Sequence, residues 1–239
     1  MNINMNVKKA HGAVFIICMV LFLSCEARIE GSMAADGSAS LTVNTGLFTR
    51  TAALIQNLFN AAGQDGQALD GPAIAGSMAG APGMAFVELR NTSSAALSGQ
   101  IRISQISEFL SAGGERGFIT FQKQGAGGRC EINIDRNNGY KILSLLSPQI
   151  NDYLNALMAP IVTEEIIKKD EYLVLISTFY NRSIADEIFR STIRASIDFP
   201  GRVTSVKGGT FSARRAVFNI QLIDLLVLEE PLKYEVIWN

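Results

Sequence analysis

Few side chains in this sequence have the chemistry of a nucleophile or of a general acid or base. It has one histidine, His11, and three cysteines, Cys18, Cys25 and Cys130. Carboxylates are more frequent, and three adjacent pairs stand out: Glu164 with Glu165, Asp186 with Glu187, and Glu229 with Glu230. Because neighbouring residues of a helix or strand do not share a face, each pair is predicted to be solvated or to lie in the first turn of a helix, where the helix dipole favours acids.

Other catalytic and cofactor signatures are missing from the sequence. There is no GxxxxGK[ST] phosphate loop and no GxGxxG motif after a strand. The glycines of residues 125–129 (GAGGR) lie between two strand-like runs and predict a hairpin turn. The prediction is a protein that is not an enzyme, with no catalytic residue, no cofactor and no metal ligand. A carboxylate-dependent hydrolase acting on envelope glycans is kept as an alternative, because it needs only two carboxylates across a cleft.

The first 24 residues have the order of a secretory signal peptide. Lys8 and Lys9 precede an uncharged apolar run at residues 12–23 (GAVFIICMVLFL), and the small Ser24 follows. A basic region, an apolar region and a small residue in this order are typical of such signals. The run is shorter than the roughly 20 residues of a membrane-spanning helix. A buried core helix is the alternative.

The residues around Cys25 resemble the lipobox of bacterial lipoproteins. Phe22, Leu23 and Ser24 precede Cys25, as a large apolar residue and a small one precede the cysteine of that motif. Phenylalanine in place of the usual leucine is similar to the relaxed boxes of spirochaete-type lipoproteins. The resemblance implies cleavage between Ser24 and Cys25, and attachment of acyl chains such as palmitate to Cys25. Each buried methylene would contribute about 0.8 kcal/mol to anchoring, so we expect an exported protein held on a bacterial membrane, inner or outer.

Cleavage at this position would change the chemistry that is left. It would remove His11, and without an imidazole the mature chain has neither a Ser-His-Asp or Cys-His site nor a histidine-containing zinc site. It would also remove two lysines and no acid, so the net charge would change from −1 to −3. This charge excludes the basic surface typical of nucleic-acid binding. Cys130 would then have no partner for an internal disulfide, and we predict a small buried hydrophobic residue in a strand.

Strand-like alternation and turn residues recur along residues 25–239, which are predicted to form a single α+β domain. The class expected is an antiparallel sheet built from successive hairpins, with a layer of short helices on one face. The expected strands are residues 28–33, 38–44, 85–90, 97–103, 118–122, 129–135, 192–199, 203–206, 213–220 and 232–238. The expected helices include residues 47–62, 104–112, 184–191 and 222–228. Residues 63–83, rich in Gly, Ala and Pro, predict a flexible loop or a short helix at 73–78.

The last part of the chain resembles LppM-type bacterial lipoproteins. The segment SIDFPGRVTSVKGG joins a strand, a Pro-Gly turn, a second strand and a glycine turn, and the chain then closes on an aromatic-rich strand. The residues that carry the resemblance are Phe199, Pro200, Gly201, Val203, Gly208, Gly209 and Trp238. It implies an α+β envelope lipoprotein without known catalytic residues.

These observations predict a lipid-anchored cell-envelope protein with a structural or a partner- or ligand-binding role. Its partners would be the membrane, through the N-terminal lipid, and an envelope protein or a lipid ligand. An apolar-ligand or lipid-binding lipoprotein is the first alternative, because the apolar faces of the short helices either enclose a pocket or fill the core. Arg28 and Arg214–Arg215 are candidates for contact with anionic lipid headgroups, and a solvated strand edge is the other explanation for them.

Overall fold

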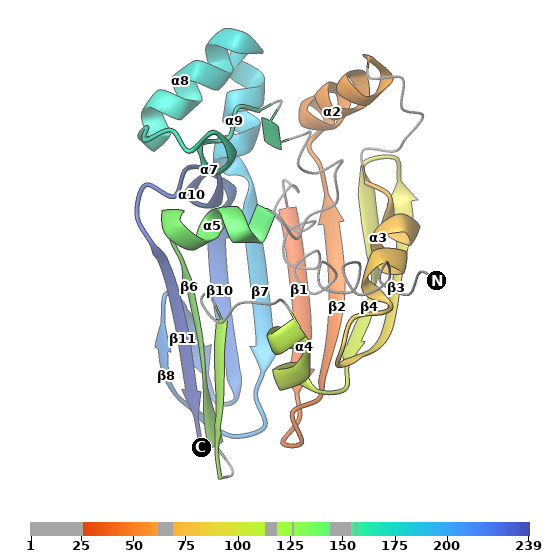
Figure 1. The fold of residues 1–239 in the computed structure, drawn as a ribbon, viewed down its shortest axis with the longest axis vertical. Helices are drawn as coiled ribbons and strands as arrows, with labels where there is room; N and C mark the ends of the chain where they lie inside the picture. The colour runs from red at the N-terminus through yellow and green to blue at the C-terminus, as the bar shows by residue number, and fades with distance from the viewer. Residues whose placement is uncertain (1–25, 62–68, 113–118, 126, 144–153, 156) are drawn as a thin grey trace, which may run out of the picture.

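The computed structural model of the chain describes residues 26–61, 69–112, 119–125, 127–143, 154–155 and 157–239. Short helices and mostly antiparallel strands confirm the predicted α+β class. Within these residues the strands form two sheets, one of seven strands and one of four. In Figure 1 most of the helices gather at the upper end of the molecule, and the hairpin turn at residues 34–38 and the C-terminus lie at the lower end. We call these the helix end and the turn end.

The larger sheet has the strand order β3-β4-β2-β1-β7-β10-β9. Its strands are β1 (Glu26–Met33), β2 (Ala39–Gly46), β3 (Met84–Ser93), β4 (Ala96–Ile103), β7 (Thr192–Asp198), β9 (Thr210–Ser212) and β10 (Arg215–Gln221). Alternation gives this sheet two different faces. In β2, for example, Ser40 and Thr42 are exposed, whereas Val43 is buried and Leu41 is half-buried. One face is therefore polar and open, and the other packs on the core, as is common for antiparallel sheets.

The smaller sheet has the order β5-β6-β11-β8, and all its pairings are antiparallel. Its strands are β5 (Ile119–Gln124), β6 (Gly127–Ile134), β8 (Val203–Lys207) and β11 (Leu232–Trp238). Gly128 of β6 faces Trp238 across the ladder. A Cβ atom at Gly128 would lie 2.4 Å from the indole ring, so only glycine lets the ring lie flat against β6.

Two pairings differ from the hairpins expected at residues 192–206. The predicted second strand of that hairpin, β8, does not pair with β7 but crosses to the smaller sheet and pairs with β11. β7 instead pairs in parallel with β1 and antiparallel with β10. The chain changes sheets between Asp198 and Val203, where Arg202 and Asn239 exchange backbone hydrogen bonds. This exchange ties the crossing to the C-terminal end of β11.

Helices cover the helix end and the inner side of the larger sheet. They are α2 (Thr49–Ala61), α3 (Gly71–Met78), α4 (Ile106–Ala112), α5 (Arg136–Leu143), α7 (Pro160–Thr163), α8 (Lys169–Phe179), α9 (Arg182–Arg190) and α10 (Leu222–Val227). None of the helices in the described ranges is long and apolar enough to cross a membrane. Part of the segment 63–83 forms α3, so of the two predictions for this segment, a flexible loop or a short helix, the helix is found over its predicted range. Asp70 caps it by accepting from the Ala73 N–H, and Ile74 and Met78 bury it against β3.

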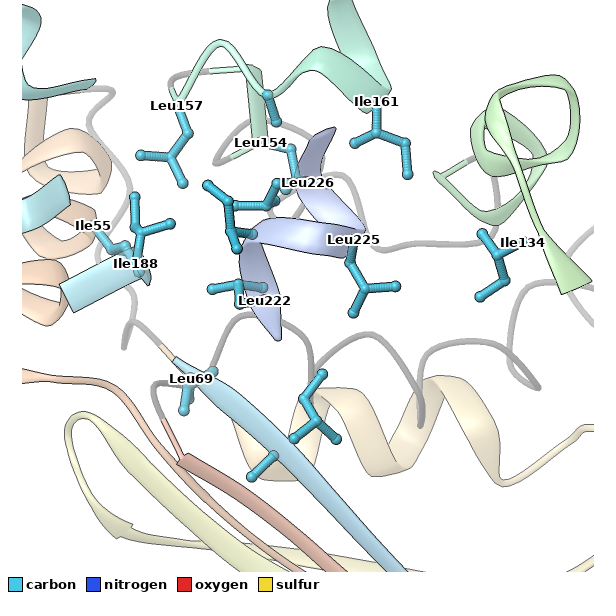
Figure 2. Packing of buried hydrophobic residues seen from close by; sticks show 14 of the residues in the cluster. Ile55, Leu69, Ile134, Leu154, Leu157, Ile161, Ile188, Leu222, Leu225 and Leu226 are labelled. Carbon is cyan, nitrogen blue, oxygen red and sulfur yellow. The ribbon is translucent and has the colours of Figure 1, made fainter. Parts of the chain in front are cut away.

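The buried side chains form two separate clusters. The larger cluster extends from the helix end along the inner side of the larger sheet. At the helix end α10 inserts Leu222, Leu225 and Leu226 between the other helices and the sheets. Figure 2 shows these leucines surrounded by residues of α2, α7, α9 and β6. The smaller cluster lies at the turn end, and its buried members are Met33, Phe199, Val203, Ala216, Val236 and Trp238.

One acidic residue of the helix end is buried, although the sequence pattern predicted a solvated side chain at its position. Glu187 of α9 is buried, whereas its neighbour Asp186 is exposed. The Glu187 carboxylate accepts hydrogen bonds from the Thr51 N–H at 2.8 Å and the Thr51 hydroxyl at 2.7 Å. The Arg50 N–H donates to its second oxygen at 3.3 Å. The prediction of a solvated surface is therefore wrong for Glu187, because this side chain satisfies the free N–H groups of the first turn of α2.

Candidate apolar binding cavity

The two sheets turn their apolar faces toward each other, and rows of side chains cross each face in register. One row of the larger sheet runs from Ile101 through Leu41 to Ile197, and the next contains Val43, Ala195 and Phe218. On the smaller sheet, Cys130 lies between Phe121 and Val236. Side chains of the two sheets also contact each other. Phe218 of β10 and Tyr234 of β11 form an edge-to-face pair with ring centroids 5.7 Å apart.

Between these faces lies an apolar cavity of about 220 Å³. It separates the two hydrophobic clusters, and residues of both contribute to its wall. The lining residues are Ser32, Met33, Ala39, Leu41, Ile103, Ile106, Cys130, Ile132, Ala195, Ile197, Phe199, Phe218, Tyr234, Glu235 and Val236. Almost all the surface that they present to the cavity is apolar.

Small side chains at facing positions explain why this space is not filled. Ala39 and Ala195 lie on the larger sheet, and Cys130 lies on the smaller one. Sheets packed face to face are about 10 Å apart, and a pair of alanine and cysteine side chains does not span that gap. Large side chains close the space on both sides. The Trp238 ring lies 4.9 Å from that of Phe199 at the turn end, and the Phe218–Tyr234 pair lies toward the helix end.

The polar groups at the cavity are held in their neutral forms. Cys130 as a whole is half-buried, but its thiol group lies deep between the sheets. The burial of the thiol raises the pKa of Cys130 to about 12. Burial, together with the nearby Asp224, raises the pKa of Tyr234 to about 12 as well. A thiol with such a pKa is a thiol and not a thiolate at neutral pH, so it acts as a small apolar wall residue.

Glu235 is the one carboxylate in the wall, and it is already paired. Its Oε2 accepts from the Arg129 guanidinium at 3.0 Å, and the same guanidinium contacts Glu131 at 3.0 Å. Alternation along β11 turns Glu235 away from the face that carries Tyr234 and Val236. The cavity can therefore bury hydrocarbon but offers no free charge to a ligand.

A wider concavity of about 720 Å³ lies on the open polar face of the larger sheet. Its wall is mainly polar and includes Arg28, Asn44, Arg194 and Asn219. Of these two hollows, the one between the sheets has the character of a ligand site, because its wall is apolar.

The residues that the sequence singled out fall in different places. Cys25 and Ser24, the predicted lipidation and cleavage residues, lie outside the described residues. Cys130 lies in β6, as predicted, and forms part of the cavity wall. Of the described residues, no three His, Cys, Asp or Glu side chains come together as a metal site. The acidic pairs belong to neither sheet face that lines the cavity.

Sequence reasoning missed the cavity itself. Period-two alternation correctly predicted strands at 192–199 and 213–220, which contain Ala195 and Phe218. What it lacked was the pairing of the strands into two sheets, since that pairing brings Ala195 and Cys130 to the wall of one cavity. The signal that was available is a small residue in the middle of an otherwise large apolar series, such as Ala195 between Ile193 and Ile197.

Comparison with known protein families and with curated protein sequences found no match to this chain. Comparison with solved structures found the NMR structure of the folded domain of the LppM protein of Mycobacterium tuberculosis. The two are 10% identical, with a TM-score of 0.41, over 90% of this chain and 88% of that one.

Proposed function

We propose that this chain is a lipid-anchored envelope protein, not an enzyme, whose domain binds an apolar group such as an acyl chain between its two sheets. The observation that supports this function is the apolar cavity between Cys130 and Ala195. Together with the resemblance of residues 22–25 to a relaxed, spirochaete-type lipobox, it suggests a domain that receives hydrocarbon at a membrane surface.

The size and chemistry of the cavity restrict the ligand class. Pockets for drug-sized molecules have volumes of about 300–1,000 Å³, and a cavity of about 150 Å³ takes up benzene. The 220 Å³ space therefore fits part of one acyl chain or a compact apolar molecule rather than a whole diacyl lipid. Because no free charge lines it, a polar headgroup would remain outside.

Substitutions that fill the cavity test the proposal. Ala195→Ile and Cys130→Leu each add volume inside the cavity, and we expect both to weaken the binding of decanoic acid by about tenfold or more. Isothermal titration calorimetry on the purified chain gives the affinity. In the absence of the ligand, both variants should unfold at a temperature equal to or above that of the wild type, because they fill a void.

The matched control is Ser196→Ile, next to Ala195 in β7 but on the opposite face of the sheet. It adds a comparable side chain without entering the cavity, so its affinity should equal that of the wild type. Wild-type binding in both filling variants, or the absence of any binding by the wild type, would exclude this ligand site.

The anchor is tested separately. Cys25→Ala should abolish incorporation of radiolabelled palmitate by the producing cell, because the thiol that accepts the lipid is removed. The Cys130→Ala variant is the control and should be labelled like the wild type. Labelling that persists without Cys25 would place the lipid elsewhere.

The hydrolase alternative receives no comparable support. It requires a second carboxylate across a cleft from the first. Glu235 at the cavity and Glu26 at the polar concavity are the single carboxylates of their walls. We therefore keep the non-catalytic function as the proposal.

A further inference from the structure

The first strand begins directly after the residue proposed to carry the lipid. β1 starts at Glu26, and Glu26 pairs with Thr192 of β7 and Gly46 of β2 in the middle of the larger sheet. One residue spans at most about 3.6 Å. If Cys25 carries the lipid, as proposed above, no tether separates the membrane from the folded domain. The surface around Glu26 must then lie at the membrane.

That surface carries two unpaired arginines. Arg28 and Arg194 occupy directly neighbouring positions of the parallel strands β1 and β7, on the open face of the larger sheet. Both are exposed, and neither has an ion-pair partner among the residues that the structure describes. Asn44 and Asn219 continue the row on either side. The acids nearest along β1, Glu26 and Glu30, flank Arg28 on the same face.

Next to this row, the end of α9 adds an aromatic residue and a further cation. Phe189 is exposed over 56% of its surface, which is high for a residue of its size. Arg190 follows it and lies over the ring of Phe48, 5.6 Å from the centroid. Figure 1 shows α9 and α2 at the end of the molecule where β1 and β7 begin. Aromatic side chains are enriched at membrane–water interfaces, and basic residues are attracted to anionic headgroups.

We propose that Arg28, Arg194, Phe189 and Arg190, which we call the anchor face, rest on the headgroup layer of an anionic membrane. The lipid on Cys25 would hold the protein there, and the anchor face would set its orientation. Phosphate groups of the lipids would pair with Arg28 and Arg194, and Phe189 would enter the interfacial layer. The turn end, with Trp238 and the hairpin loops, would point away from the membrane.

Fluorescence quenching in vesicles tests the orientation. The full chain in a Cys130→Val background would carry a bimane label at Phe189→Cys or at Phe211→Cys. Phe211 has a similar exposure, 47%, but lies in β9 toward the turn end. The vesicles would contain equal parts of phosphatidylglycerol and phosphatidylcholine, with brominated acyl chains as the quencher. We expect the label at position 189 to be quenched several times more strongly than the label at 211.

Charge reversal then tests the arginines without altering the labelled site. Arg28→Glu with Arg194→Glu should reduce quenching at position 189, whereas Lys123→Glu with Lys207→Glu, which reverses two exposed cations of the smaller sheet, should leave it unchanged. A mass spectrum of the N-terminal peptide reports the lipid on Cys25. A lipidated protein with equal quenching at both labels would overturn the orientation alone. A protein without lipid on Cys25 would overturn the orientation together with the anchor.

Discussion

The two hydrophobic clusters share several strands, such as β1 and β7, but differ in how completely they are filled. At the helix end, α8, α9 and α10 insert side chains such as Ile176, Ile188 and Leu226 against the sheets, and these residues are at most 3% exposed. Around the cavity most of the wall comes from the two sheets, with Ile106 of α4 as the one helical residue in it, and Ile197, Phe218 and Cys130 are half-buried there. Helices adjust their position to fill a space, whereas two sheets fixed by their ladders leave whatever gap their side chains do not span.

We infer from this difference that the two regions have different roles. The closely packed cluster at the helix end contributes mainly to stability, and the residues around the cavity, which we call the hollow region, contribute mainly to binding. Substitutions in the two regions should therefore have effects of different size and different kind.

The largest expected effect is the truncation of Ile176, which is fully buried in α8. Ile176→Ala should lower the free energy of unfolding by about 3–4 kcal/mol, because it removes buried surface and leaves a void in close packing. Ile197→Ala at the cavity wall should cost about 1 kcal/mol, since that side chain already borders empty space. Urea denaturation of both variants measures the contrast. Equal losses would mean that the two clusters are packed alike.

Removal of the Glu187 carboxylate should have the next largest effect. Glu187→Ala leaves the Thr51 N–H, the Thr51 hydroxyl and the Arg50 N–H without their acceptor, and we expect a loss of about 2 kcal/mol. The exposed neighbour provides the control, because Asp186→Ala should change stability by less than about 0.5 kcal/mol. Similar losses in the two variants would contradict the capping role of Glu187.

Titration of Cys130 in the hollow region should lower the stability of the protein at alkaline pH. The pKa of Cys130 is raised to about 12 in the folded protein, against about 8.5 in an unfolded chain. Above pH 8.5 the unfolded state therefore binds fewer protons, and stability falls as the pH rises. Between pH 8.5 and 10 the loss should reach about 2 kcal/mol.

Cys130→Val lacks this titration and should lose correspondingly less stability over the same interval, as measured by urea denaturation at each pH. Above pH 10 the raised pKa of Tyr234 should destabilise both proteins. Parallel curves for the wild type and Cys130→Val below pH 10 would place the thiol in contact with water.

The smallest effect is expected at the surface of the turn end. Hydrogen bonds from Arg215 hold the pKa of Asp198 below its usual value. The stabilisation is present above the pKa of the unfolded chain, about 3.9, and disappears as the pH falls through the lowered pKa. Because the pair is exposed, solvent screens it. Asp198→Asn should thus leave stability at pH 7 almost unchanged and slightly flatten its decline below pH 4. A large loss at pH 7 would show that this edge of the larger sheet depends on the pair.

Local features of the sequence predicted much of the fold. Alternation and turn residues gave the hairpins β1–β2, β3–β4 and β5–β6, and apolar periodicity gave α9 and α10, because these depend on neighbours in the chain. The assignment of β8 to the second sheet and the parallel pairing of β1 with β7 join distant segments, and no local pattern encodes them. The cavity depends on both, so the sequence left open whether the helices cover a pocket or a filled core. The helices at the helix end fill the core, and the hollow lies between the sheets, where α4 contributes Ile106 to the wall.

Glu187 shows a different kind of error. The argument that adjacent acids do not share a face was correct, but it was applied to the pair as a whole. Ile184 and Ile188 mark the buried side of α9, and Glu187 lies three residues after Ile184, on that side. A test of each acid against the apolar stripe would have separated Glu187 from Asp186.

The position of β1 in the sheet also sets the order in which the chain can fold. β1 emerges first during synthesis, yet its two partners come from opposite halves of the chain, β2 at once and β7 only after most of the protein has followed. Until β7 arrives, the early four-stranded unit β3-β4-β2-β1 has an open edge along β1, and such edges attract strands of other molecules. A chain with this topology therefore leaves that edge unprotected until β7 is made, and fragments that end before Thr192 should aggregate where the full chain does not.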